Sequence, residues 1–403
     1  LKVPSLEKQL DVQGLYSNYL WQQSTDNTSC FKNIHALAPG KYLKIDLLSH
    51  QIFTHTYWDS LHLAQFQRTS TSIEHIEDLL HQIVKKQLKA DVPIIAMLSG
   101  GIDSTTLSAI AKQYKPDLAS YTLALSDQQY NELPQANAIA THLKLKSHIQ
   151  QLHADDLLND LEASLIHFEA PYTSIEPVVM AAKFMQEQQF KVVINGIGAD
   201  ELFGGYLYFH KAPNAKEFHE ETVRKLDKLH QYDCLRANKS LAAWGIEGRV
   251  PFLDKEFIDV AMNINPEDKM IKNGRIEKWV LREAFKDYLP ESVLWRQKEQ
   301  FSDGVGYSWI DSLKDLVSKE VSDHDLENAS KIFSINTPRN KEEYYYRLIF
   351  SDHFSSDAAA KSVPSVPSVA CSTPQALEWD EAFKNMNDPS GRSISNIHNE
   401  SYE

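Results

Sequence analysis

The chain has 403 residues, of which 42% are hydrophobic and 24% charged, a composition typical of a globular protein with roughly two or three domains. Its formal net charge of −14 argues against a broad nucleic-acid-binding surface, and no apolar run approaches the roughly 18 residues that cross a membrane. Three widely spaced cysteines, Cys30, Cys234 and Cys371, suggest neither a disulfide framework nor a zinc site, so we expect a cytoplasmic protein with inert thiols.

The N-terminal part, residues 1–67, is predicted to be the remnant of a small β-containing domain together with a linker. Residues 31–46 indicate a strand, a turn at Pro39 and Gly40, and a second strand. A helix is predicted next, because residues 71–74 (T-S-I-E) fit a capping box and apolar residues then recur at helical spacing as far as Leu88.

The main domain, residues 68–355, is predicted to begin with alternating strands and helices. The predicted strands are 93–98, 120–125, 147–152 and 191–195, and the predicted helices between them are 104–113, 132–143, 157–167 and 178–187. This alternation predicts a parallel α/β sheet with binding sites at the carboxyl ends of its strands. Further helices at 216–243, 255–262, 276–288 and 309–320 predict a helical C-terminal cap. The Ser- and Pro-rich tail, residues 356–403, is expected to contain one short helix near 376–386.

The first glycine loop, residues 99–104, reads S-G-G-I-D-S and lies between an apolar strand and a helix. Its two glycines allow the backbone to approach an anion closely, and the helix start presents free N–H groups to that anion. The loop lacks the lysine of the kinase-type P-loop, and its pattern resembles the pyrophosphatase loop of enzymes that split ATP into AMP and pyrophosphate. The carboxylate of Asp103 suits magnesium. Taken alone, the motif is also compatible with an ordinary turn.

The second glycine loop, residues 195–206, reads N-G-I-G-A-D-E-L-F-G-G-Y and also follows an apolar strand. In a parallel sheet two such loops can face one ligand, which would make Asp103 and Asp200 two hard oxygen ligands for one magnesium ion. The alternative is structural, with Asp200 as a helix N-cap and Gly204-Gly205 as a turn.

The two loops, together with W-G-I-E-G-R-V-P-F-L-D at 244–254, resemble the synthetase domain of bacterial-type glutamine-hydrolysing asparagine synthetases. The resemblance covers most of the chain and is closest after Asp200, where it includes R-Q-K-E-Q-F-S-D-G at 296–304. Residues 1–59 resemble the last part of the glutaminase domain. The resemblance implies an ATP-pyrophosphatase (adenine nucleotide alpha hydrolase-like) fold, ATP and Mg2+ as cofactors, and aspartate and ammonia as substrates. It also implies an aspartyl-adenylate, with release of AMP and pyrophosphate.

The resemblance assigns roles to individual positions. Those matching adenine and ribose contacts are Leu98 and Leu123. Those matching nucleotide-binding positions of the two loops are Ser99, Gly100, Gly101, Asp103, Ser104, Asn195 and Gly196. Asp200 matches a magnesium-pyrophosphate residue, and Lys298 matches a lysine of the synthetase site. We expect a fixed cation at Lys298 to serve catalysis with Asp103 and Asp200, because adenylation and ammonia attack both build negative charge. A solvated surface charge is the alternative for Lys298.

The sequence departs from the family pattern at three places. Residue 1 is Leu rather than the cysteine nucleophile of the glutaminase domain, and Cys30 lies in polar loop sequence, so glutaminase activity is not expected. The ammonia would then be free or come from a separate glutaminase, and a homodimer is a further expectation. Ile197 stands where the bacterial enzymes carry Glu, a side chain that supports adenylate formation. Residues 170–177 lack the arginine that would pair with a substrate carboxylate.

Two alternatives to asparagine synthesis follow from these departures. The same adenylation chemistry could act on another carboxylate, as in amide- or ring-forming synthetases of secondary metabolism. The chain could also be a non-catalytic protein that keeps the fold and the ATP contacts. For Glu247 and Arg249, an ion pair that holds the helical cap is favoured slightly over a place in the substrate pocket.

Overall fold

The computed structural model describes residues 9, 32–59, 73–125, 133–153, 156, 159–160, 163–164, 167, 177–272, 274–296, 307–353, 355–360 and 372–384. The chain forms two compact units. The smaller comprises Leu1–Asp59, Leu158–Ile175 and Ile310–Pro367, and the larger comprises Ser60–Leu157, Glu176–Trp309 and Ser368–Glu403. None of the described helices is both long and apolar enough to cross a membrane.

A five-stranded parallel sheet forms the centre of the larger unit, in the order β5-β4-β3-β6-β7. Its strands are β3 (Ile94–Met97), β4 (Ala119–Leu125), β5 (Lys146–Leu152), β6 (Val192–Ile194) and β7 (Glu247–Arg249). The predicted parallel α/β fold is therefore confirmed. After β3 the chain adds β4 and β5 on one side and β6 and β7 on the other. The strand order reverses between β3 and β6, and ligands of such sheets bind at the carboxyl ends of the strands at this point.

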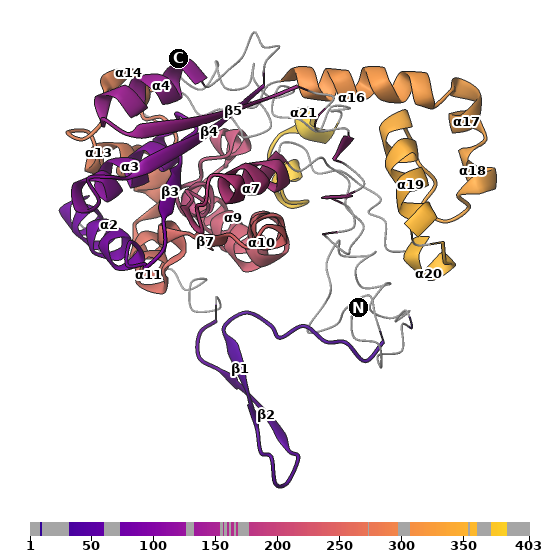
Figure 1. Cartoon of the computed structure of the whole chain (residues 1–403), viewed down its shortest axis with the longest axis horizontal. Coiled ribbons are helices and arrows are strands. Elements are labelled where there is room, and N and C mark those ends of the chain that lie inside the picture. The colour runs from indigo at the N-terminus through magenta and orange to yellow at the C-terminus, as the bar shows by residue number, and fades with distance from the viewer. Residues whose placement is uncertain are drawn as a thin grey trace. The chain divides into compact units, whose positions relative to one another are not determined.

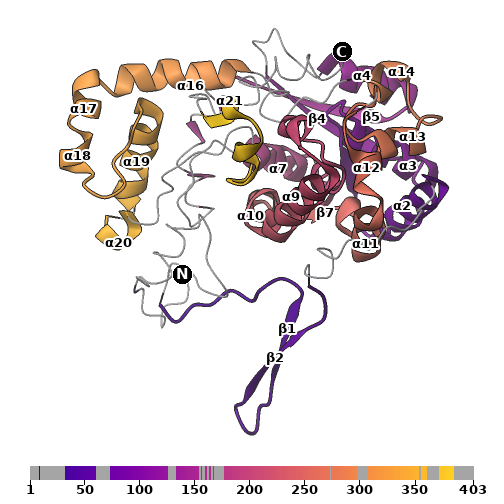
Figure 2. The same cartoon turned by 180° about the vertical axis from the view of Figure 1, so that it is seen from behind.

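Helices cover both faces of the sheet (Figure 1). On one face, Ile95 and Val193 pack against Met185 of α7 (Pro177–Glu187) and Leu241 of α10 (Asp233–Ala243). The helices α2 (Ile73–Gln87) and α3 (Ile102–Tyr114) lie on the other side of β3 in Figure 1, and Figure 2 also shows them on the opposite side of the larger unit from α7 and α10. Burial of both faces explains why β3 and β6 are continuous apolar runs rather than alternating patterns.

The remaining described helices of the larger unit range from single turns to the 14-residue α9. They are α4 (Leu133–His142), α8 (Ala199–Phe203), η2 (Leu207–Lys211), α9 (Ala215–Lys228), η3 (Leu229–Gln231), η4 (Pro251–Leu253), α11 (Lys255–Asn263), α12 (Pro266–Lys269), α13 (Trp279–Ala284), α14 (Glu291–Leu294), η6 (Ala376–Trp379) and α21 (Glu381–Lys384). Two predictions need correction here. The helix predicted at 216–243 is interrupted at Tyr232, and the helix predicted from Ile276 begins only after Lys278, whose φ of +59° lies in the left-handed region.

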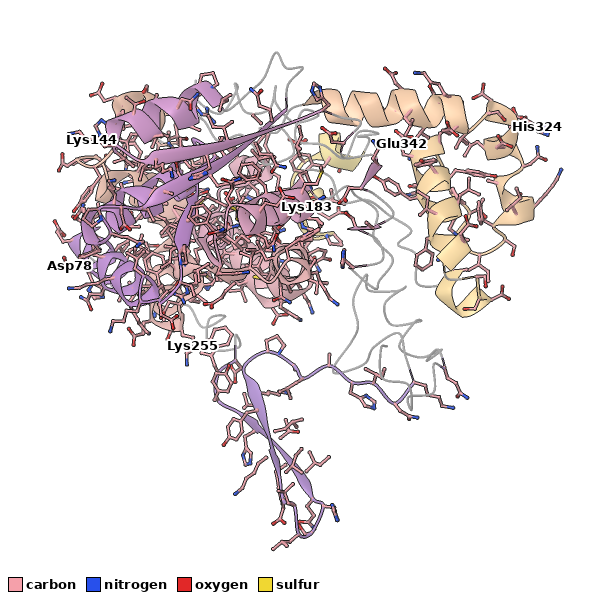
Figure 3. The ribbon with its side chains drawn as sticks, in the orientation of Figure 1. Asp78, Lys144, Lys183, Lys255, His324 and Glu342 are labelled. Carbon is pink, nitrogen blue, oxygen red and sulfur yellow. The ribbon has the colours of Figure 1, made fainter. Side chains whose placement is uncertain are left out.

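The smaller unit contains an antiparallel hairpin of β1 (Lys41–Ile45) and β2 (Ile52–Thr56). The prediction of two strands within 31–46 was therefore wrong for the first strand, since the partner of β1 follows it in sequence. The side chain of Asp46 accepts hydrogen bonds from the backbone N–H groups of Leu48 and Ser49, both at 2.9 Å, and this turn directs the chain back. Side chains of both strands project outward from the hairpin in Figure 3. Exposed apolar residues of the two strands include Leu43, Ile45, Ile52 and Phe53.

The described helices of the smaller unit are α16 (Tyr307–Glu320, which belongs to this unit from Ile310 onward), α17 (Asp323–Glu327), α18 (Ala329–Ile332), α19 (Lys341–His353) and α20 (Asp357–Ala360). Phe333, Tyr344 and Phe350 form buried parts of their core. The guanidinium of Arg347 lies 5.4 Å from the ring centre of Phe333 and 6.0 Å from that of Phe350, and burial lowers its pKa.

Candidate active site between two glycine loops

The first glycine loop is fixed by hydrogen bonds within it. Ser104 Oγ accepts a hydrogen bond from the Ser99 backbone N–H and lies 3.1 Å from Ser99 Oγ. Gly100 has a φ of +82°, and a Cβ at this position would lie 2.9 Å from Cβ of Gln135. Helix α3 begins directly after Gly101. The loop is therefore held in a conformation in which the N-terminus of α3 can bind an anion.

The second glycine loop leaves β6 beside the first. The backbone N–H of Asn195 donates to the carbonyl of Arg249 in the neighbouring β7, and the Asn195 side chain accepts from the N–H of Ile197. Gly198, with a φ of +103°, starts α8, on which Asp200 lies. A Cβ on Gly196 would lie 3.0 Å from Cβ of Asp103. The two loops are thus in contact at the switch point of the sheet.

Asp103 and Asp200 converge on one ammonium group, that of Lys278. Lys278 Nζ lies 2.6 Å from Asp103 Oδ2 and 2.6 Å from Asp200 Oδ1, so the two carboxylate oxygens are no more than twice that distance apart. The Lys278 side chain is 0% exposed and the carboxylates are 16% and 18% exposed. Because one ammonium group contacts both carboxylates, the two carboxylates are close enough to bind a single metal ion as well.

Lys278 did not stand out in the sequence, and a buried ion pair holds its backbone. Arg282 Nη2 donates to Glu277 Oε1 at 2.6 Å, and Arg282 Nε donates to the Glu277 carbonyl at 2.7 Å, with both side chains buried. Nη1 of Arg282 donates to the carbonyl of Leu294. His210 Nε2 lies 4.0 Å from the other carboxylate oxygen of Glu277. These contacts fix the peptide that precedes Lys278.

Glu201, the residue after Asp200, is buried beside the site. Burial, and secondarily the charge of Asp200, raises the pKa of the Glu201 carboxyl. The Tyr206 hydroxyl donates to this carboxyl, and Lys225 Nζ lies 4.6 Å from the centre of the Tyr206 ring. Burial, with a further contribution from Glu201, raises the pKa of Cys234 to about 12, as expected for an inert thiol.

The other predicted site residues lie at different places. Leu98 directly follows β3 and packs with α4, whereas Leu123 in β4 packs with the cluster on the α7 face. The backbone of Leu98 is hydrogen-bonded to Tyr121 and Thr122 of β4, the two residues before Leu123. The adenine contact of Leu98 and Leu123 stays a prediction. Lys298 and residues 170–176 lie outside the described residues, as do Cys30 and Cys371. Ile197 is half-buried in the second loop, and its side chain offers no metal ligand.

The site fits magnesium only if further oxygen ligands are supplied. Among the residues that the structure describes, no group of three or more His, Cys, Asp or Glu side chains is arranged to hold a metal ion. Magnesium needs six oxygens and commonly takes one or two carboxylates together with substrate phosphates and water. Asp103 and Asp200 would supply the two carboxylates, and the phosphates of a nucleotide and water would supply the other oxygens.

Arg249 forms the ion pair with Glu247 that the sequence slightly favoured, but its further contacts are to the end of α2 rather than to the predicted helical cap. Its Nε donates to Glu247 Oε1 at 2.7 Å, and its Nη1 donates to the backbone carbonyls of Gln87 and Lys89 at the end of α2. The side chain therefore ties β7 to α2.

Comparison with known proteins identifies relatives that match most of the chain. A family model described as asparagine synthase matches residues 75–217 and 211–381. Asparagine synthetase B (glutamine-hydrolyzing) of Escherichia coli strain K12 is 49% identical over 351 residues, covering 83% of this chain and 63% of that protein. Glutamine-hydrolyzing asparagine synthetase 2 of Arabidopsis thaliana is 48% identical over 346 residues, covering 81% and 60%. The chain spans about three fifths of the length of these curated relatives.

The solved structure of NMN synthetase from Francisella tularensis aligns with 71% of this chain and 97% of that chain, at a TM-score of 0.32 and 14% identity.

Proposed function

The chain belongs to the asparagine synthase family, and we propose that it forms the side-chain amide of aspartate from ammonia, using the magnesium complex of ATP. The observation that supports this most is the meeting of Asp103 and Asp200, from two different loops, at one Nζ atom. The names of the relatives, at 48–49% identity, favour aspartate over another carboxylate as the acceptor.

We assign the triphosphate of ATP to the two glycine loops. The N–H groups at the start of α3, together with Ser99 and Ser104, would donate to phosphate oxygens. Gly100, Gly101 and Gly196 would allow the close approach that this needs. Asp103 and Asp200 would hold magnesium, which supplies charge neutralisation for the leaving pyrophosphate.

The proposed reaction has two steps. A carboxylate oxygen of aspartate attacks the α-phosphorus, the bond between that phosphorus and the bridging oxygen to the β-phosphate breaks, and pyrophosphate leaves. The nitrogen of ammonia then attacks the activated carbonyl carbon, loses a proton, and AMP leaves with the C–O bond electrons. Lys278 lies within the site, and its charge would stabilise the negative charge that develops on the phosphates. Lys298 is assigned the same kind of role from the resemblance alone.

The other expectations from the sequence remain proposals. These are ammonia supplied free or by a separate glutaminase, a homodimer, and a location in the cytoplasm. Because Ile197 carries no carboxylate and residues 170–177 contain no arginine, other side chains would have to bind the aspartate. The identity of the acceptor therefore needs a direct test.

The test is pyrophosphate and AMP release from MgATP in the presence of ammonium and aspartate, with a panel of other carboxylic acids in parallel. We expect aspartate-dependent release that Asp103→Ala reduces by at least about a hundredfold. Asp117→Ala, which removes an exposed carboxylate paired with Lys115, serves as the matched control and should change nothing. Equal rates for the unchanged chain and Asp103→Ala would contradict the proposal. Release with another acid alone would support the alternative acceptor, and tight ATP binding without release would support a binding protein.

A further inference from the structure

Lys278 occupies the point at which the two proposed magnesium ligands meet. We propose that its ammonium balances Asp103 and Asp200 before nucleotide binds, so that the metal enters the site only together with ATP. This inference rests on the proposed function and concerns how the same site is regulated.

The ammonium and a metal ion cannot share this point. Magnesium binds carboxylate oxygens at about 2.0–2.1 Å, and Nζ already lies 2.6 Å from one oxygen of each carboxylate. Two cations at such distances from the same oxygens would also repel each other strongly in a site shielded from water. A metal that binds these same two oxygens, Asp103 Oδ2 and Asp200 Oδ1, must therefore displace the ammonium.

The position of Lys278 is built into the fold. Its side chain is 0% exposed, its backbone is held in the left-handed region, and the buried Glu277–Arg282 pair fixes the preceding peptide. Gly205 supplies the space for the side chain, because a Cβ there would lie 2.1 Å from both Lys278 Cε and Asp200 Oδ1. A lysine held in this way is a stable counter-ion for the two carboxylates.

ATP supplies what displacement requires. Its phosphates offer a new anionic partner for the ammonium of Lys278. They also supply oxygen ligands that the metal needs in addition to the carboxylates of Asp103 and Asp200. Without nucleotide, a metal ion would gain two carboxylates but would leave a buried ammonium without them. The coupling between metal and nucleotide is therefore expected to be strong and reciprocal.

The experiment measures Mn2+ binding by electron paramagnetic resonance, with Mn2+ as the probe, in the absence and presence of ATP. Without ATP, we expect Lys278→Met to bind Mn2+ about tenfold or more tightly than the unchanged chain. Lys278→Arg, which keeps the charge, is the matched control and should stay as weak as the unchanged chain. Lys278→Gln is the second neutral variant if Lys278→Met does not fold, and Mn2+ should raise its unfolding temperature more than that of the unchanged chain.

The outcomes separate this inference from the proposed function. If the unchanged chain binds Mn2+ equally well with and without ATP, or if folded Lys278→Met and Lys278→Gln gain no affinity, the counter-ion role is wrong. If ATP gives strong Mn2+ binding while the neutral variants gain nothing, only this inference fails. If the unchanged chain binds no Mn2+ even with ATP, the proposed function fails as well.

Discussion

Gly205 leaves the space that the Lys278 side chain fills, since a Cβ built on this glycine would lie 2.1 Å from Lys278 Cε. The same Cβ would lie 2.1 Å from Asp200 Oδ1. The second glycine of the G-G pair is therefore needed for the contact between lysine and carboxylate, and its backbone φ is not in the left-handed region.

Gly205→Ala is expected to reduce aspartate-dependent pyrophosphate release by at least about tenfold, because Asp200 or Lys278 must move. The measurement is the steady-state rate at saturating MgATP. Gly274→Ala is the control, because a Cβ there meets nothing within 4 Å. That variant should cost only about 1 kcal/mol of stability from its positive φ and leave the rate unchanged. A normal rate in Gly205→Ala would contradict the packing described here.

Arg282→Met is expected to lower the free energy of unfolding by about 3 kcal/mol, because it removes the partner of the buried Glu277 carboxylate. Arg282→Lys should recover little, since an ammonium cannot replace the fork of donors that reaches Glu277 and Leu294. Urea unfolding measures both. Arg339→Met, which breaks the more exposed pair with Glu343, should cost less than about 1 kcal/mol. Similar decreases in the free energy of unfolding for Arg282→Met and Arg339→Met would contradict a larger contribution from the buried Glu277–Arg282 pair.

Lys269 is expected to make stability rise with pH. Burial lowers its pKa from 10.5 to about 7, and Nζ donates to the Leu202 carbonyl at 2.9 Å. Between pH 7 and 10.5 the unfolded chain binds more protons than the folded chain, so the free energy of unfolding increases with pH in this window. Below pH 7 both states carry the proton, and the contribution of Lys269 becomes constant.

Urea unfolding at pH 7, 8 and 9 tests this for the unchanged chain and Lys269→Met. The stability of the unchanged chain relative to the variant should increase by up to roughly 1 kcal/mol per pH unit. The same substitution at the exposed Lys286 is the control. A difference that is constant between pH 7 and 9 would contradict the lowered pKa.

Glu221 is expected to anchor residues 372–384 to α9. Its buried carboxylate accepts hydrogen bonds from the Tyr208 hydroxyl at 2.8 Å, from Arg224 Nε at 2.8 Å and from Thr373 Oγ1 at 2.7 Å. Phe383 packs in the same aromatic cluster as Tyr208. Glu221→Gln should therefore cost about 2 kcal/mol and speed amide hydrogen exchange in residues 376–384. Glu220→Gln, on the more exposed side of α9, should change neither, and unchanged exchange in Glu221→Gln would refute the anchor.

The parallel sheet could be predicted because two of its strands, β3 and β6, are short apolar runs followed by glycine loops. Ile94–Met97 and Val192–Ile194 are buried on both faces, and strands buried in this way are recognisable in the sequence as continuous apolar runs. Strand β7 could not be predicted in this way, because Glu247, Gly248 and Arg249 carry no apolar pattern and become a strand only by pairing with β6.

The site was predicted in part for the same reason. Asp103 and Asp200 lie in loops whose glycines mark a close approach of backbone, so their meeting followed from the topology of a parallel sheet. Lys278 could not be predicted, because it lies 175 residues from Asp103 within a stretch that has helical periodicity. Its left-handed backbone and the buried Glu277–Arg282 pair are consequences of tertiary packing, which local patterns do not encode.

The most direct test of the two-loop site is a double-mutant cycle on ATP-dependent Mn2+ binding with Asp103→Asn, Asp200→Asn and the two combined. If both carboxylates hold one metal beside the nucleotide, each single variant should lose at least about tenfold in Mn2+ affinity, and the double variant should lose clearly less than the product of the two. Losses that multiply independently, or a single variant with unchanged Mn2+ affinity in the presence of ATP, would contradict a metal shared by the two loops.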